Sequence, residues 1–152
     1  MVCLWCKGKG NLAVSLSGDV RTGVATARVR RWFSTWGILV GYCTLIFVLS
    51  SQSDLTVPEV VPSADKLVHF LEYAGVGWLW TRAVRADRPR WTALTVLLST
   101  LAFAGVYGLS DEWHQLYVPG RFVDLYDFLA DVCGGSSGGI GYLLWLRFRE
   151  TR

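Results

Sequence analysis

The stretch WTALTVLLSTLAFAGVYGL, residues 91–109, decides how this chain folds, because it carries no charged side chain over its whole length. At a rise of about 1.5 Å per residue, a helix of this length matches the roughly 30 Å hydrocarbon core of a bilayer. Three more apolar segments, residues 32–50, 67–84 and 128–145, have nearly the same length. Residues 67–84 and 128–145 contain acids or glycines and predict a span less strongly. The sequence therefore predicts an all-α polytopic membrane protein, a bundle of four transmembrane helices.

The composition agrees with a membrane protein. Hydrophobic residues make up 52% of the 152 residues and charged residues only 18%, a balance that argues against a soluble globule. We expect the lipid bilayer as the surroundings of the chain and no nucleic-acid partner. Three regions are predicted: a basic N-terminal arm over residues 1–31, disordered or lying on the inner membrane surface; a four-helix domain over residues 32–148; and a short tail over residues 149–152.

The basic residues predict the orientation. Thirteen of the fifteen Lys and Arg residues fall in the N-terminal arm, in the connection between the second and third segments, or in the tail. Only Lys66 and Arg121 fall in the opposite loops. The positive-inside rule then predicts a multi-pass protein of the cell membrane with both termini in the cytoplasm.

The acidic residues cluster on the other side. Three groups with helical spacing place polar residues on one face of the second, third and fourth segments, at the outer end of each. These groups are Asp65, His69 and Glu72; Asp111, His114 and Gln115; and Asp124, Asp127 and Asp131. Lys66, Glu112 and Arg121 lie beside them in the sequence. Ionisable residues at membrane depth mark a functional site, so we expect all twelve side chains to form an outward-facing ligand-binding pocket.

Small residues at helical spacing predict close helix packing next to this pocket. The pairs are Ala104 with Gly108, Gly134 with Gly138, and Gly135 with Gly139. Small residues let helix backbones approach closely in lipid. The alternative is that the GGSSGG run is a flexible segment.

The chemistry of the pocket stays open at this point. The two histidines fit a structural hydrogen-bond network, a proton relay or a metal site, and no spacing is diagnostic of any one of these. Candidate catalytic residues are His69, Glu72, Asp111, Glu112 and His114. Arg121 follows a predicted Pro119-Gly120 turn, where it either pairs with a nearby carboxylate or binds an anionic headgroup. No cofactor is predicted, with a divalent metal kept as an alternative. Cys3 and Cys6 lack the second ligand pair that a structural zinc site needs.

Several of these residues together resemble a known family. The shared features are Asp65-Lys66-x-x-His69-x-x-x-Tyr73, Asp111-Glu112-x-His114-Gln115, Pro119-Gly120-Arg121, and Asp124-x-x-Asp127-x-x-Ala130-x-x-x-Gly134, with Ser51-Gln52 before them. Over about residues 35–147 the chain is similar to the VanZ-like family of bacterial membrane proteins. One departure is Asp131, where that family usually has Asn. The family is named for a protein associated with teicoplanin resistance, so the resemblance implies a cell-envelope role and no defined reaction.

Three functions follow as hypotheses. The first is binding of an envelope lipid, a wall precursor or an amphipathic antibiotic such as a glycopeptide, with a role in resistance. The second is an enzyme that modifies such a molecule by acid/base or metal-assisted chemistry. The third is a small proton-coupled transporter or accessory subunit. The sequence predicts no GxSxG nucleophile elbow, which needs a turn between a strand and a helix, and four spans with the charge at one end offer no polar path to the cytoplasm. Binding is therefore favoured, and whether the chain is an enzyme is left undecided.

Overall fold

The computed structural model describes residues 25–52 and 64–152, so Cys3 and Cys6 and most of the predicted arm lie outside the described residues. All the regular structure in these two ranges is helical, which confirms the all-α prediction. Residues from 35 to the C-terminus form one compact unit, and the described residues before them belong to a separate unit. In that first part, residues 25–32 are α-helical. Of these, residues 25–31 belong to the arm predicted over residues 1–31.

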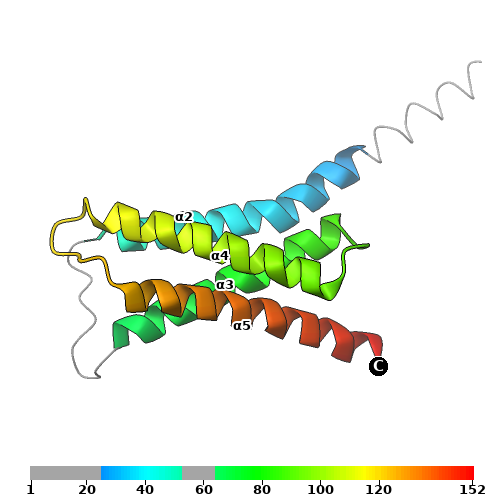
Figure 1. Ribbon diagram of the computed structural model, residues 1–152. Coiled ribbons are helices and arrows are strands. Elements are labelled where there is room, and N and C mark those ends of the chain that lie inside the picture. Colours follow the sequence, from blue (N-terminus) through cyan, green and yellow to red (C-terminus); the bar gives the residue numbers. More distant parts are fainter. Residues whose placement is uncertain (1–24, 53–63) are drawn as a thin grey trace, which may run out of the picture. The chain divides into compact units, whose positions relative to one another are not determined.

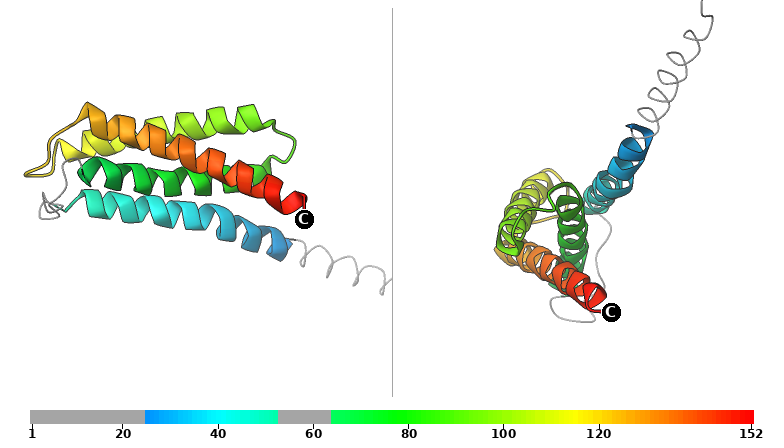
Figure 2. Two further views of the ribbon diagram at one scale, coloured as in Figure 1. Left: turned by 90° about the horizontal axis from the view of Figure 1, so that it is seen from below. Right: turned by 90° about the vertical axis from the view of Figure 1, so that its right-hand side faces the viewer.

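Four α-helices make up the second unit together with the end of a short π-helix, η1 (Phe33–Gly37). They are α2 (Ile38–Ser50), α3 (Ala64–Asp87), α4 (Ala93–Gln115) and α5 (Leu125–Glu150). Figures 1 and 2 show them running side by side along a common direction. Each of the four apolar segments of the sequence corresponds to one of these helices.

Polar contacts at the two ends of the bundle show that the helices alternate in direction. At one end, Gln115 at the end of α4 donates a hydrogen bond to Ser50 at the end of α2, over 3.4 Å. At the other end, the indole of Trp36 donates to Asp87 at the end of α3, over 2.7 Å. The ends of α2 and α4 and the starts of α3 and α5 therefore share one end of the bundle.

Glycines bring α5 into direct backbone contact with α3. A Cβ atom at Gly134 would overlap the carbonyl of Phe70, and one at Gly138 would overlap the carbonyl of Ala74. A Cβ at Gly77 of α3 would likewise overlap the carbonyl of Gly135. A side chain at any of these glycines would push the two helices apart. The glycines therefore set the short distance between α3 and α5.

The other helices attach through small and hydroxyl-bearing residues. A Cβ at Gly135 would lie 2.5 Å from Cβ of Ala104 in α4, and a Cβ at Gly139 would lie 3.0 Å from Cγ2 of Thr100. The hydroxyl groups of Thr81 and Thr100 are hydrogen-bonded over 2.9 Å, linking α3 to α4. These contacts hold α4 against the surface that α3 and α5 form.

Local signals fix where the helices begin. The Thr92 side chain accepts a hydrogen bond from the amide of Thr95 and caps α4. Asp124 is in an extended conformation and caps α5 by accepting from the amide of Tyr126 over 2.9 Å. Between these helices Gly120 has a φ of 82°, which confirms the predicted Pro-Gly turn, because a residue with a side chain rarely adopts this conformation.

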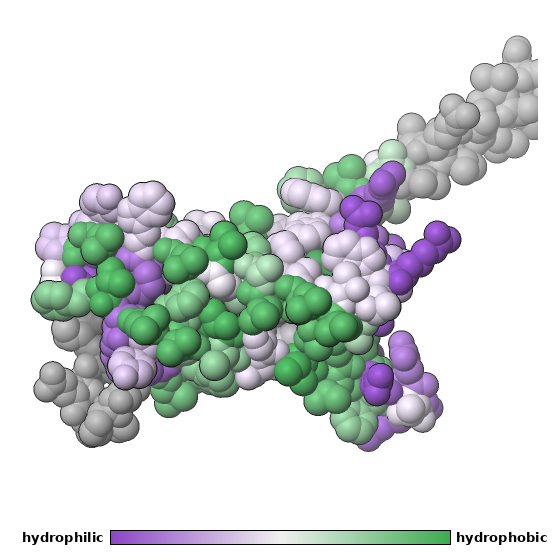
Figure 3. Space-filling model, in the orientation of Figure 1, coloured by the Kyte–Doolittle hydropathy of each residue, from purple (hydrophilic) through white to green (hydrophobic). Residues whose placement is uncertain are grey.

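Two helices of the described chain are long and apolar enough to cross a membrane: Ala25–Ser50, which counts residues 25–50 as one helix, and Ala93–Gln115. Many apolar side chains of the bundle are exposed, among them Leu98 and Val106 of α4 and Ile140 of α5. Figure 3 shows hydrophobic residues over the middle of one face and hydrophilic residues gathered toward the ends. An exposed apolar surface of this extent is typical of contact with lipid.

Candidate functional site

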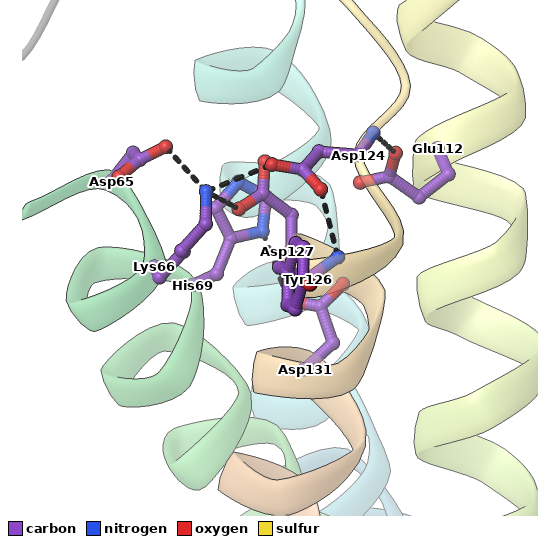
Figure 4. A network of polar contacts seen from close by, with 8 residues as sticks. All are labelled: Asp65, Lys66, His69, Glu112, Asp124, Tyr126, Asp127 and Asp131. Carbon is purple, nitrogen blue, oxygen red and sulfur yellow. Dashed lines mark hydrogen bonds and ion pairs between the residues drawn. The ribbon is translucent and has the colours of Figure 1, made fainter. Parts of the chain in front are cut away.

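Lys66 links the first turns of α3 and α5 through three acids. Its ammonium group donates hydrogen bonds to Asp65 over 2.9 Å, to Asp124 over 2.9 Å and to Asp127 over 3.1 Å. Figure 4 shows the ammonium between Asp65 on one side and the two α5 acids on the other. The Asp124 carboxylate thus forms a salt bridge to Lys66 of α3 and also caps the start of α5.

These contacts fix the charges at the edge of the site. The hydrogen bond to Lys66 holds the pKa of the Asp65 carboxyl below its usual value, and a hydrogen bond to Lys66 does the same for the pKa of Asp124. The hydrogen bond to Asp124, followed by that to Asp65, raises the pKa of the Lys66 ammonium. At neutral pH this group is therefore a cation held among three carboxylates.

One helical turn further along α3, His69 makes a second connection to α5. Its Nδ1 lies 2.9 Å from Oδ1 of Asp131, and both residues are buried. The Asp131 carboxylate has room because Gly108 of α4 faces it: a Cβ at Gly108 would lie 3.1 Å from Oδ2. A glycine predicted to pack helices therefore also leaves space for an acid of the site.

Glu112 connects α4 to the same group. Its Oε2 accepts a hydrogen bond from the backbone amide of Asp124 over 3.0 Å, as Figure 4 shows. Asp111, the preceding residue, accepts a hydrogen bond from Gln115 over 3.4 Å. The helices α3, α4 and α5 thus bring the predicted site acids into one region. These acids are Asp65, Glu72, Asp111, Glu112, Asp124, Asp127 and Asp131.

A cavity of about 220 Å³ lies beside this network. Its walls come from α2, α3, α4 and the loop before α5. The lining residues are Leu49, Ser50, Asp65, Val68, His69, Glu72, Asp111, Gln115 and Arg121. Six of the predicted site residues (Asp65, His69, Glu72, Asp111, Gln115 and Arg121) are therefore on the cavity wall.

Four buried polar atoms near this region have no hydrogen-bond partner within the described part of the chain. They are Oδ1 of Asp111, Oε1 of Glu112, Oδ2 of Asp131 and the hydroxyl of Tyr73. Buried polar groups are normally satisfied, and an unsatisfied buried carboxylate oxygen costs several kcal/mol as an order of magnitude. Three such oxygens in one region indicate a place for a ligand, an ion or ordered water.

Two predicted residues lie apart from the network. His114 turns toward α2, where its Nε2 is 2.9 Å from the hydroxyl of Ser51 and its ring centroid is 4.3 Å from that of Phe47. Arg121 donates a long hydrogen bond of 3.5 Å to the carbonyl of Gln52 while also lining the cavity. The two histidines therefore have different surroundings, and only His69 lies among the acids.

The sequence alone gave no signal for several residues that build the site. Leu49 and Val68 form its apolar wall, and nothing in their spacing distinguishes them from other apolar residues of their helices. Ser50 binds Gln115 but lies within an apolar segment. Gly77 was not among the predicted packing residues, and its contact with Gly135 depends on the rotation of α3.

Comparisons with known proteins place the chain in a family. The family model described as VanZ/LLP1 matches residues 22–149, which is nearly the whole chain and more than the resemblance noted from the motifs. No curated protein and no solved structure matches the chain. The family match and the two apolar helices fit a membrane protein of the VanZ kind. The chain belongs to the VanZ/LLP1 family.

Proposed function

We propose that this protein binds the zwitterionic headgroup of an amphipathic cell-envelope molecule in the cavity at the outer end of its helices. In this proposal α2 to α5 all cross the membrane, and both termini are in the cytoplasm. The observation that carries the proposal is the cavity itself, which combines carboxylates, one guanidinium group and apolar side chains on its walls. The molecule would be a lipid, a wall precursor or an amphipathic antibiotic such as a glycopeptide.

The charges on the cavity wall suit a ligand with groups of both signs. Glu72 and Asp111 supply carboxylates for an ammonium group, and Oδ1 of Asp111 has no partner within the described residues. Arg121 supplies a guanidinium, whose planar fork suits a phosphate or a carboxylate. A ligand with one cationic and one anionic group would pair with the carboxylates and with the guanidinium at the same time.

The size and the rim of the cavity support a headgroup rather than a whole ligand inside it. A volume of about 220 Å³ is below that of a pocket for a drug-sized molecule, roughly 300–1,000 Å³. Leu49 and Val68 line the cavity and are 38% and 39% exposed, so an alkyl chain could leave over them toward lipid. The polar part would be enclosed while the apolar part stays in the bilayer.

Binding can be tested on the solubilised protein. We expect native mass spectrometry to find a retained zwitterionic amphiphile, and added zwitterionic lipid to raise the unfolding temperature more than an anionic lipid does. Glu72→Gln and Asp111→Asn, which keep side-chain shape, should each weaken this binding about tenfold, since a hydrogen bond to a charged group contributes about 1.5–3 kcal/mol. Glu150→Gln, at the opposite end of α5, is the matched control. Equal binding by all three variants would disprove the headgroup site.

The proposed orientation has a separate test. The distribution of basic residues leads us to expect that a reporter active only outside the cytoplasm works when fused after Val118. The same reporter fused after Asp87 or at the C-terminus should be inactive. Activity after Asp87 would contradict the four-span arrangement, whatever the cavity binds.

A second candidate function, chemistry on the bound headgroup, is favoured by the unpartnered oxygens of Asp111, Glu112 and Asp131 beside His69. Asp111 and His69 line the cavity, where they would be able to exchange protons with a ligand. Mass spectrometry of the bound amphiphile before and after incubation with purified protein distinguishes the two functions. An unchanged ligand mass supports binding, and a changed mass that disappears in Asp111→Asn supports an enzyme.

A further inference from the structure

We infer that His69, Glu112 and Asp131 form a binding site for one divalent transition-metal ion, with Zn²⁺ or Mn²⁺ as the class of ion that fits. The three residues come from α3, α4 and α5 respectively. One potential ligand atom from each lies within 4.8 Å of the other two. This inference does not depend on the proposed headgroup, because metal binding can be measured with no other ligand present.

The first support is burial combined with unused binding capacity. His69 is 8% exposed, Glu112 4% and Asp131 0%. Oε1 of Glu112 and Oδ2 of Asp131 have no partner among the residues that the structure describes. The other oxygen of each carboxylate is already bonded, to the amide of Asp124 and to His69 respectively. Each carboxylate is therefore fixed through one oxygen and offers the second.

The second support is the balance of charge. Lys66 is the cation closest in sequence to His69, and its hydrogen bonds go to Asp65, Asp124 and Asp127. Among the residues that the structure describes, the imidazole of His69 is then the basic partner of Asp131, and Glu112 has no basic partner. Two buried carboxylates with one imidazole are costly when ionised. A divalent cation would offset both charges at once.

The geometry fits the ion with a small closure of the side chains. Zinc bonds of about 2.0–2.2 Å to nitrogen and oxygen place opposite ligand atoms at most about 4.4 Å apart. Nδ1 of His69 lies 2.9 Å from Oδ1 of Asp131, so the imidazole and the carboxylate that would share the ion are already in contact, and Oδ2 of Asp131 stays available as the ligand atom.

The choice of ion follows from the ligand atoms. Imidazole nitrogen suits zinc, and carboxylate oxygen suits manganese, so a set of one nitrogen and two oxygens fits either and disfavours calcium. Three protein ligands leave a coordination position for water or a ligand atom. Because His69 also lines the cavity, such a position would be near the proposed headgroup site.

The test uses the full chain with Cys3→Ser and Cys6→Ser, which removes the other sequence feature able to bind zinc. The detergent-solubilised protein is stripped with EDTA and titrated with Zn²⁺ and, separately, with Mn²⁺. We expect about one ion per chain, determined by elemental mass spectrometry, and a rise in unfolding temperature. His69→Gln, Glu112→Gln and Asp131→Asn should each weaken binding by about tenfold or more. His114→Gln and Glu150→Gln, which make the same chemical changes elsewhere, should bind as the parent does.

Two results would overturn the inference: no bound ion in the parent protein, or unchanged binding in all three site variants. If a site variant does not fold, X-ray absorption of the zinc-loaded parent decides the question. One imidazole with oxygen ligands supports the site. A sulfur ligand, or two or more imidazoles, overturns it.

Discussion

Gly138→Ala is expected to destabilise the protein by about 3 kcal/mol or more, although alanine is the best helix former. The added methyl group would overlap the carbonyl of Ala74, which belongs to the α3 backbone and cannot rotate away. The helices α3 and α5 would have to separate, and the other close contacts between them would loosen as well. The unfolding temperature of the detergent-solubilised protein, followed by tryptophan fluorescence, measures the effect.

Gly105→Ala is the matched control for this prediction. It makes the same change in α4, where an added Cβ meets no atom within 4 Å. Helix propensity alone then acts, and we expect a stabilisation of up to about 1 kcal/mol. Gly134→Ala, which meets the carbonyl of Phe70, should resemble Gly138→Ala. Equal stability of the Gly138 and Gly105 variants would show that close backbone contact does not hold α3 and α5 together.

Asp131→Ala is expected to cost about 3 kcal/mol, measured in EDTA so that no metal contributes. The substitution leaves Nδ1 of buried His69 without its partner and opens a space beside Gly108. Asp131→Asn should stay within about 1 kcal/mol of the wild type. Its amide oxygen can accept the same hydrogen bond from His69, and the family resemblance also places Asn at this position.

A double-mutant cycle separates the contribution of the His69–Asp131 contact from the cost of the space that Asp131→Ala opens. If His69 and Asp131 stabilise the fold through their contact, His69→Ala should add little in the background of Asp131→Ala. Fully additive losses would mean that each residue contributes through packing alone. The same variants serve the metal experiment, because Asp131→Asn should keep the fold while it binds the ion more weakly.

The sequence by itself determined the helices and the end of the bundle that carries the site. Apolar segments of about 18–20 residues predict helices whatever their neighbours are, because the backbone hydrogen bonds of a helix are internal. The Pro119-Gly120 turn was predictable because it also depends on local sequence: Gly120 supplies the positive φ that the turn requires. Helical spacing also placed Asp65, His69 and Glu72 on one face of α3.

Only the tertiary structure decided which faces meet. Lys66 binds two acids of α5, whereas His114, on the same stripe as Asp111 and Gln115, contacts α2. The contact of Gly77 with Gly135 and the use of Leu49 and Val68 as cavity walls were equally absent from the pattern. Spacing fixes which residues share a face, but the rotation of each helix about its axis depends on how its surface fits its neighbours. In a mostly apolar helix, hydrophobicity alone does not select that rotation, and close packing of small residues does.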